Sequence, residues 1–229
     1  MKKRVVFFVI NKDLDIKNHL IGLDSYKNKL HSRTKQKNEF YDKLLKLSSK
    51  KRRAAIRKNI GRFYLPEKCK FLNSIAKDVN SEWAKIETVY FKRLEKIHKH
   101  PFPFSSVKAV LSSAGRFGYN TDGRWFAASM LQNKFASIDI ATHELMHFMF
   151  HKYYWKVCEK SGLSWKQIWN IKEAFTVLLN IEFSDIRFQP DNGYPEHKKI
   201  RTAIENSWKQ NRAFNKALSV AINTAKLSS

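Results

Sequence analysis

Two histidines and a glutamate stand together in the segment His143–His147, which reads His-Glu-Leu-Met-His. Residues four apart on a helix lie on one face, about one turn apart, so the two imidazoles are placed to bind one cation. Imidazole nitrogens bind Zn²⁺ at about 2.0–2.1 Å. Glu144 follows the first histidine, where its carboxylate can take a proton from a metal-bound water. We therefore expect a zinc site in which Glu144 is the catalytic base.

The residues around this segment are apolar on almost every face from Ile138 to about Val157, which predicts a buried helix. Two histidines and a glutamate in such a helix are costly unless something satisfies them, and a metal ion does so. The alternative is structural: His143 and His147 are then core histidines bonded to carbonyl groups, and Glu144 faces solvent.

Two histidines leave a zinc site incomplete, so another residue must supply a third ligand. The spacing His-Glu-x-x-His-x-x-Gly-x-x-His is excluded, because Phe150 and Tyr153 occupy the positions of the glycine and the last histidine. His151 is excluded as well, because eight residues rotate it by about 80° from the direction of His143.

Glu173 is the better candidate for the third ligand. It lies 26 positions after His147 on the next predicted helix, which opens with a capping box at Ser164–Gln167 and runs to about Phe183. A carboxylate among such apolar neighbours favours a nearby cation. The same helix has a polar stripe at Asn170, Thr176 and Asn180, directed toward the expected metal. An ordinary surface glutamate is the alternative.

The chain is predicted to divide into two regions at Pro101-Phe102-Pro103. Each proline removes a backbone donor and disfavours helix at the preceding residue, so the helix before them must end there. We expect a basic, mainly helical region at residues 1–100 and a catalytic domain at residues 101–229. The first region is predicted to contain a buried strand and two helices, at Val5–Ile10, Lys43–Arg62 and Glu82–His98. His98 and His100, beside the prolines, are expected to be solvated.

The second region is predicted to begin with two strands that pair as a hairpin, Val107–Leu111 and Arg124–Met130, around turn residues at Tyr119–Gly123. Asp191-Asn192-Gly193 is typical of a turn. Two further helices, at about 196–210 and 213–227, are predicted to close the chain.

The charge of the chain is strongly positive, with 44 Lys and Arg against 20 Asp and Glu and a formal net charge of +24. The segment Lys43–Arg62 contains nine basic residues and no acidic residue. Such a surface concentrates anions, and nucleic acid is a possible partner through the basic N-terminal region. The alternative is a solvated helix face in a protein that is rich in lysine for other reasons.

The sequence has no run of about 18 apolar residues, the length that a membrane helix requires, so we expect no membrane partner. The apolar run Val5–Ile10 is shorter than the core of a signal peptide. Cys69 and Cys158 are too few for a disulfide framework, which favours a reducing compartment. We expect a cytoplasmic protein.

His-Glu-x-x-His on one helix, followed by a ligand glutamate on a second, resembles the gluzincin group of zinc metallopeptidases. The similarity covers about residues 124–197, and the chain is similar in scale to the compact minigluzincins. The resemblance implies an α+β, zincin-like fold: a small, mostly antiparallel sheet packed on the active-site helix, with a helical lower part. It also implies a strand that binds extended peptide, for which residues 124–129 are the candidate.

The resemblance also implies supporting residues. Many gluzincins have an aspartate four residues after the glutamate ligand, where this chain has Val177. Asp139, Asp185 and Asn180 are possible substitutes. Gluzincins generally stabilise the oxyanion with a Tyr or His downstream of that ligand, and Tyr194 and His197 are a closely spaced pair of this kind. The alternative is a surface loop in which both are ordinary residues.

The sequence therefore indicates two candidate functions. The first is a zinc-dependent endopeptidase that hydrolyses a peptide or protein substrate with a metal-activated water. In it, His143, His147 and Glu173 bind Zn²⁺, Glu144 activates the water, and Tyr194 or His197 stabilises the oxyanion. The alternative is a nucleic-acid-associated protein whose zincin domain is structural or acts on a DNA-bound protein.

Overall fold

The structure is a computed structural model that describes residues 5–28 and 38–227. It divides into two compact units: a sheet unit, Met1–Lys85 with Ser106–Ala141, and a helical unit, Ile86–Ser105 with Thr142–Ser229. This division differs from the predicted boundary between residues 1–100 and 101–229. The reason is that the first strand of the chain pairs with a strand that follows the prolines, which places both strands in one unit.

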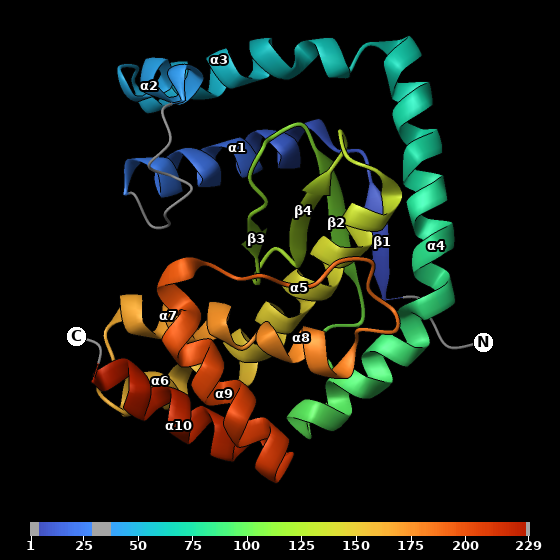
Figure 1. Cartoon of the computed structure of the whole chain (residues 1–229). Helices are drawn as coiled ribbons and strands as arrows, with labels where there is room; N and C mark the ends of the chain where they lie inside the picture. Colours follow the sequence, from blue (N-terminus) through green and yellow to red (C-terminus); the bar gives the residue numbers. More distant parts are fainter. Residues whose placement is uncertain (1–4, 29–37, 228–229) are drawn as a thin grey trace. The chain divides into compact units, whose positions relative to one another are not determined.

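The sheet unit is built on four strands in the order β1-β2-β4-β3 (Figure 1). They are β1 (Val6–Val9), β2 (Val107–Ser112), β3 (Tyr119–Asn120) and β4 (Trp125–Ser129). The β1–β2 and β2–β4 pairs are parallel, and only β3–β4 is antiparallel. The α+β class is confirmed, but the expectation of a mostly antiparallel sheet is wrong, because the sheet is mixed.

The predicted hairpin between β2 and β4 is also wrong. The two strands are neighbours, but residues 113–124 bring the chain back to the start of β4, so they pair in parallel. The turn after Asn120 instead joins β3 to β4, and the Gly123 amide donates a hydrogen bond to Oδ1 of Asn120. Because β2 and β3 both pair with Trp125 and Phe126, β4 is an interior strand along this part. That residues 124–129 bind extended peptide stays a prediction.

Helices complete the sheet unit: α1 (Lys12–Lys27), α2 (Glu39–Leu45), α3 (Ser49–Ile60), the 3₁₀ turn η2 (Gly61–Phe63) and the first part of α4 (Pro66–His98). The helix predicted at residues 43–62 is thus two helices. The Arg52 guanidinium donates to the carbonyls of Leu44 and Leu45 at 3.0 Å, which satisfies two acceptors at the end of α2. Helices α1, α2 and α3 share one core, made of Ile16, Leu23, Tyr41, Leu44, Ile56 and Ile60.

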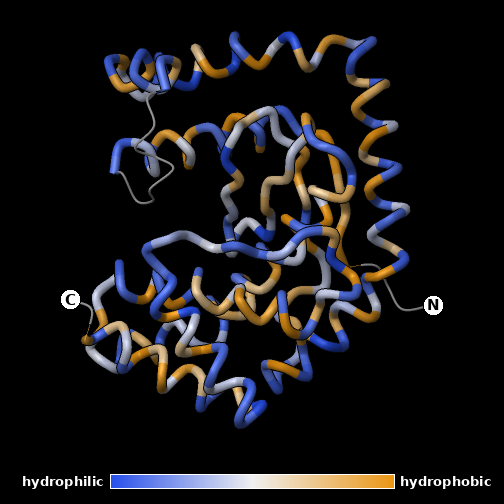
Figure 2. Tube along the Cα trace, in the orientation of Figure 1, coloured by the Kyte–Doolittle hydropathy of each residue, from blue (hydrophilic) through white to orange (hydrophobic). Residues whose placement is uncertain are grey.

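Helix α4 covers the edge of β1. The Asn80 side chain accepts a hydrogen bond from the Phe8 amide at 3.1 Å and donates one to the Phe8 carbonyl at 2.8 Å. It therefore replaces the missing neighbouring strand at that residue. Hydrophilic and hydrophobic residues alternate along α4 (Figure 2), as expected for a helix that is buried on one side.

The helical unit contains the last part of α4, the part of α5 (Lys134–Tyr153) from Thr142 onward, and the rest of the C-terminal chain. Its other elements are α6 (Trp155–Lys160), α7 (Trp165–Ala174), α8 (Val177–Glu182), the 3₁₀ turn η3 (Pro195–His197), α9 (Lys198–Asn211) and α10 (Phe214–Lys226). The capping box of Ser164 and Gln167 is confirmed. The helix predicted from Ser164 to about Phe183 is interrupted after Ala174, so α7 and α8 are separate.

Two histidines expected in solvent lie in different surroundings. His98 is buried, and its ring lies 4.4 Å from the ring of Phe214 and 5.5 Å from that of Tyr154. His100 is exposed and stacks on Tyr153. The expectation was wrong for His98, because the chain ends α4 against the core of the helical unit. In residues 5–28 and 38–227, none of the helices has both the length and the apolar composition that a membrane crossing requires.

Candidate metal centre

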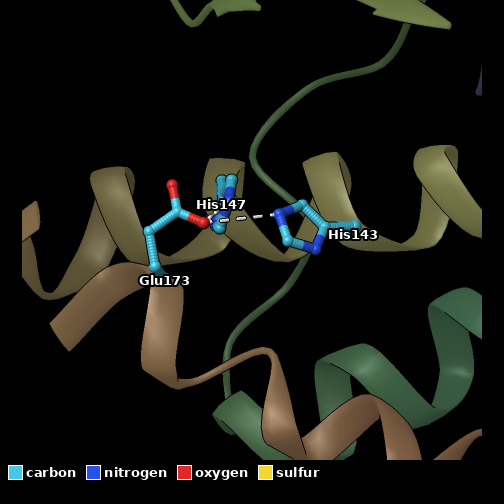
Figure 3. Close-up of side chains that lie close together, drawn as sticks. All are labelled: His143, His147 and Glu173. Atoms are coloured by element: carbon cyan, nitrogen blue, oxygen red, sulfur yellow. Dashed lines mark ion pairs between the residues drawn. The ribbon is translucent and has the colours of Figure 1, made fainter. Parts of the chain in front are cut away.

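The predicted ligands converge within the helical unit. Helix α5 presents His143 and His147 on one face, with ring centroids 4.4 Å apart, and α7 contributes Glu173. Oε2 of Glu173 lies 3.5 Å from Nε2 of His143 and 3.4 Å from Nε2 of His147 (Figure 3). One ligand atom from each residue lies within 4.8 Å of the others. This His-His-Glu group can hold a metal ion.

The two nitrogen–oxygen spacings are compatible with zinc. A tetrahedral ion with bonds of about 2.0–2.1 Å places its ligand atoms about 3.3–3.4 Å apart. The two nitrogen–oxygen distances, 3.5 and 3.4 Å, are close to this value. Glu173 and His147 are buried, whereas 23% of the His143 side chain is exposed. Solvent therefore reaches the group from the side of His143.

Lys172 forms an ion pair with Glu173. Its side chain is fully buried, and its Nζ lies 2.7 Å from Oε1 of Glu173. Oε1 is the carboxylate oxygen that does not face the histidines. Burial raises the pKa of Glu173, but the Lys172 ammonium and then the histidines outweigh it and hold that pKa well below the usual range. Glu173 is thus a buried carboxylate that keeps its charge.

Asp191 orients His143. Nδ1 of His143 lies 2.7 Å from Oδ2 of Asp191, so the other ring nitrogen is directed toward Glu173. Burial lowers the pKa of His143, but the carboxylates of Asp191, Glu173 and Glu144, Asp191 first, together outweigh it and raise that pKa to about 10. A carboxylate on the distal nitrogen of a histidine ligand fixes the tautomer and the orientation of the ring.

Asp191 is itself held by several partners. Its Oδ1 lies 2.8 Å from Oγ1 of Thr176 and accepts from Nη1 of Arg201 at 3.0 Å. Oδ1 of Asn180 accepts a hydrogen bond from the Asp191 backbone amide at 2.7 Å, and Nδ2 of Asn180 donates one to the Asp191 carbonyl at 2.9 Å. Gly193 follows in the left-handed region, with φ of 62°. An added Cβ there would lie 2.7 Å from Nη1 of Arg201, so only glycine leaves room for the guanidinium.

Asp191, Arg201 and Lys172 were missed in the sequence. The one signal for them was the polar stripe on the helix of Glu173, since Thr176 and Asn180 both bond to Asp191.

The substitutes considered for the missing aspartate have different roles. Asn180 supports Asp191 and not the histidine directly. Asp185 instead pairs with Arg93, with Oδ2 2.8 Å from Nη2. Asp139 belongs to the sheet unit.

Glu144 is buried beside the ligands, at 6% exposure. Its Oε2 has no hydrogen-bond partner among the residues that the structure describes. Burial raises its pKa to about 7. A buried carboxylate oxygen without a partner is costly, so this oxygen is placed to receive a hydrogen bond from a bound molecule.

Tyr194 lies just before η3 and His197 is its last residue, and their ring centroids are 5.4 Å apart. His197 is fully buried, and its Nε2 lies 3.2 Å from Oδ1 of Asn170, one turn before Glu173 on α7. Burial lowers the pKa of His197 to about 4, so the ring is neutral at neutral pH. Tyr194 is half-buried. His197 therefore packs against the helix that carries Glu173.

Comparison of the chain with protein-family models, curated protein sequences and solved structures finds no match.

Proposed function

We propose that the protein is a zinc-dependent metallopeptidase, an endopeptidase that hydrolyses a peptide or protein substrate. The observation that carries the proposal is the convergence of His143, His147 and Glu173, whose ligand atoms lie within 4.8 Å of one another, with buried Glu144 next to His143. The resemblance to gluzincins, with the zincin-like fold that it implies, is part of this proposal.

The donor set supports a catalytic rather than a structural zinc. Structural zinc sites have four protein ligands, commonly with cysteine, whereas catalytic sites have three and keep one position open. This group offers two imidazoles and one carboxylate. The two cysteines, Cys69 and Cys158, are both free. Free thiols also support the cytoplasm as the proposed location.

Zinc, when bound, would supply a Lewis acid for the scissile carbonyl and lower the pKa of a water molecule. In our proposal, Glu144 accepts the proton of the attacking water and passes it to the leaving amine. Asp191 keeps His143 in one orientation through its hydrogen bond to Nδ1. Tyr194 or His197 donates a hydrogen bond to the oxygen on which negative charge develops.

A peptidase assay of the zinc-loaded protein tests this proposal. A mixture of peptides from digested proteins is incubated with wild type and with Glu144→Gln, and new termini are counted by mass spectrometry. We expect cleavage by wild type and a loss of about 10²–10⁴-fold in Glu144→Gln, the usual contribution of a general base. Equal cleavage by both proteins, or none by zinc-loaded wild type, would contradict the proposal.

The surface of α3 favours the alternative function, a nucleic-acid-associated protein. Lys50, Lys51, Arg53 and Lys58 are exposed, and they have no ion-pair partner among the residues that the structure describes. Other surface lysines are paired, such as Lys209 with Glu205 at 2.7 Å. Unpaired cations on one short helix are suited to phosphate groups. In this alternative, the zinc domain is structural or acts on a DNA-bound protein.

Salt dependence separates the two functions. Affinity for duplex DNA is measured at several salt concentrations for wild type and for a variant with these four α3 residues changed to Gln. A phosphate-binding role predicts a steep salt slope that becomes shallower by roughly one per lost contact. Peptide cleavage by the same variant should be unchanged. A slope equal to that of wild type would exclude α3 as the binding surface.

A further inference from the structure

A fully buried lysine beside a metal ligand needs an explanation. Lys172 has 0% exposure, and burial of an ammonium group costs several kcal/mol unless its interactions compensate. Its Nζ lies 2.7 Å from Oε1 of Glu173 and 3.7 Å from the centre of the Trp169 ring. The carboxylate and the aromatic face hold the ammonium in one place.

The two oxygens of Glu173 consequently have different partners. Oε1 accepts from Lys172, whereas Oε2 faces Nε2 of both His143 and His147 at 3.5 and 3.4 Å. A carboxylate can ligate a metal through one oxygen or through both. A second metal bond through Oε1 would compete with its hydrogen bond to the Lys172 ammonium. Because Lys172 is fully buried, water could not replace that hydrogen bond.

We propose that Lys172 is a positioning residue that restricts Glu173 to one ligand oxygen, Oε2. This role rests on the proposed zinc site. It limits the protein to three ligand atoms and keeps a coordination position for water and substrate, as catalytic zinc requires. Lys172 does not touch the reacting atoms and acts only through Glu173.

The competing explanation is that Lys172 only neutralises Glu173 in the fold. The two explanations predict opposite results for Lys172→Met. A positive charge beside a metal site opposes binding of a cation. If Lys172 positions Glu173, its removal lets both oxygens bind, so metal affinity is kept or increased while activity falls. If Lys172 only supports the fold, stability falls while the coordination of the bound metal is unchanged.

Cobalt substitution measures the coordination directly, because four-coordinate Co²⁺ absorbs visible light more strongly than five- or six-coordinate Co²⁺. Spectra and Co²⁺ affinity are recorded for wild type, Lys172→Met and Lys172→Arg, together with kcat of the zinc forms. Lys209→Met is the matched control, since Lys209 makes a 2.7 Å pair with Glu205 on the exposed face of α9. If Lys172→Met does not fold, Lys172→Gln replaces it.

We expect weaker visible absorption in Lys172→Met, metal affinity at least equal to wild type, and kcat lower by about 10–100-fold. Lys172→Arg, which keeps a cationic donor, should recover much of the visible absorption and of kcat. A Lys172→Met spectrum and kcat equal to those of wild type would overturn this role while leaving the zinc site in place. If wild type bound neither Co²⁺ nor Zn²⁺, the site itself would be wrong, and the role of Lys172 with it.

Discussion

Nδ1 of His143 and Oδ2 of Asp191 lie 2.7 Å apart, although 48 positions separate the two residues in the chain. The pair links α5 to the segment that follows α8, and Arg201 of α9 completes it through Oδ1. Because His143 is the most exposed of the three candidate ligands, this contact restricts the rotation of a ring that solvent would otherwise leave mobile.

Asp191→Asn should weaken zinc binding by about 10–100-fold, because the amide keeps the shape of the side chain but loses its charge. The affinity is measured by competition with a coloured chelator. Asp185→Asn is the control, since Asp185 pairs with Arg93 and not with a ligand. Equal affinities of wild type and Asp191→Asn would mean that Asp191 does not orient His143.

Gly193→Ala should lower both stability and zinc affinity. An alanine at φ of 62° costs roughly 1–2 kcal/mol of folding free energy, and its Cβ would also displace Arg201. Gly162→Ala is a matched control, because Gly162 has φ of 78° but nothing within 4 Å of an added Cβ. Urea unfolding and zinc titration are compared for both variants. Only Gly193→Ala should lose zinc affinity; a similar loss in Gly162→Ala would assign the effect to backbone strain alone.

Replacing the oxyanion donor should lower kcat with little change in KM, because that hydrogen bond forms mainly in the transition state. We expect a loss of about 10²–10³-fold, or roughly 2.7–4 kcal/mol, in Tyr194→Phe or in His197→Ala. His197 already bonds to Asn170, so His197→Asn is included to separate a lost donor from lost packing. Wild-type kcat in Tyr194→Phe and in both His197 variants would exclude this turn from the mechanism.

His98 should make the fold sensitive to acid. Burial lowers its pKa from 6.5 to about 3, so the folded state binds fewer protons than the unfolded state between these values. The free energy of unfolding is therefore not reduced by His98 above pH 6.5, and it decreases as the pH falls from 6.5 toward 3. At about 1.4 kcal/mol per pKa unit, roughly 2 kcal/mol is lost between pH 7 and pH 5.

Denaturant unfolding of wild type and His98→Phe at the two pH values measures this effect. Phenylalanine suits a site between the rings of Phe214 and Tyr154 and does not titrate. The stability of His98→Phe should fall less on acidification. His100→Phe is the control, since His100 is exposed. An equal decrease in the free energy of unfolding of wild type and His98→Phe would show that His98 does not cause the acid sensitivity.

The sequence was sufficient for features that depend on neighbours along the chain. His143 and His147 share a face because helix geometry places them there, and the capping box at Ser164 is a local contact. Glu173 was found because a carboxylate among apolar helix residues is costly without a cation. The exclusion of His151 agrees with the structure, in which its ring stacks on Trp155 at 4.5 Å.

Features that depend on distant pairing were not predictable. The parallel register of β1 and β2 joins residues about 100 positions apart, and alternating hydrophobicity does not specify the direction of pairing. Asp191 was visible only as a turn residue, because its partner His143 lies 48 positions before it. Lys172 was indistinguishable from the many surface lysines of a chain with net charge +24.

The most direct test of the account is the zinc content of the purified protein, measured by elemental analysis for wild type, Glu173→Ala and Glu144→Gln. We predict about one zinc per chain in wild type and in Glu144→Gln, because the proposed mechanism makes Glu144 a base and not a ligand, and almost none in Glu173→Ala. A wild-type protein that does not retain zinc, or a Glu173→Ala variant that retains it fully, would contradict the proposed metal centre.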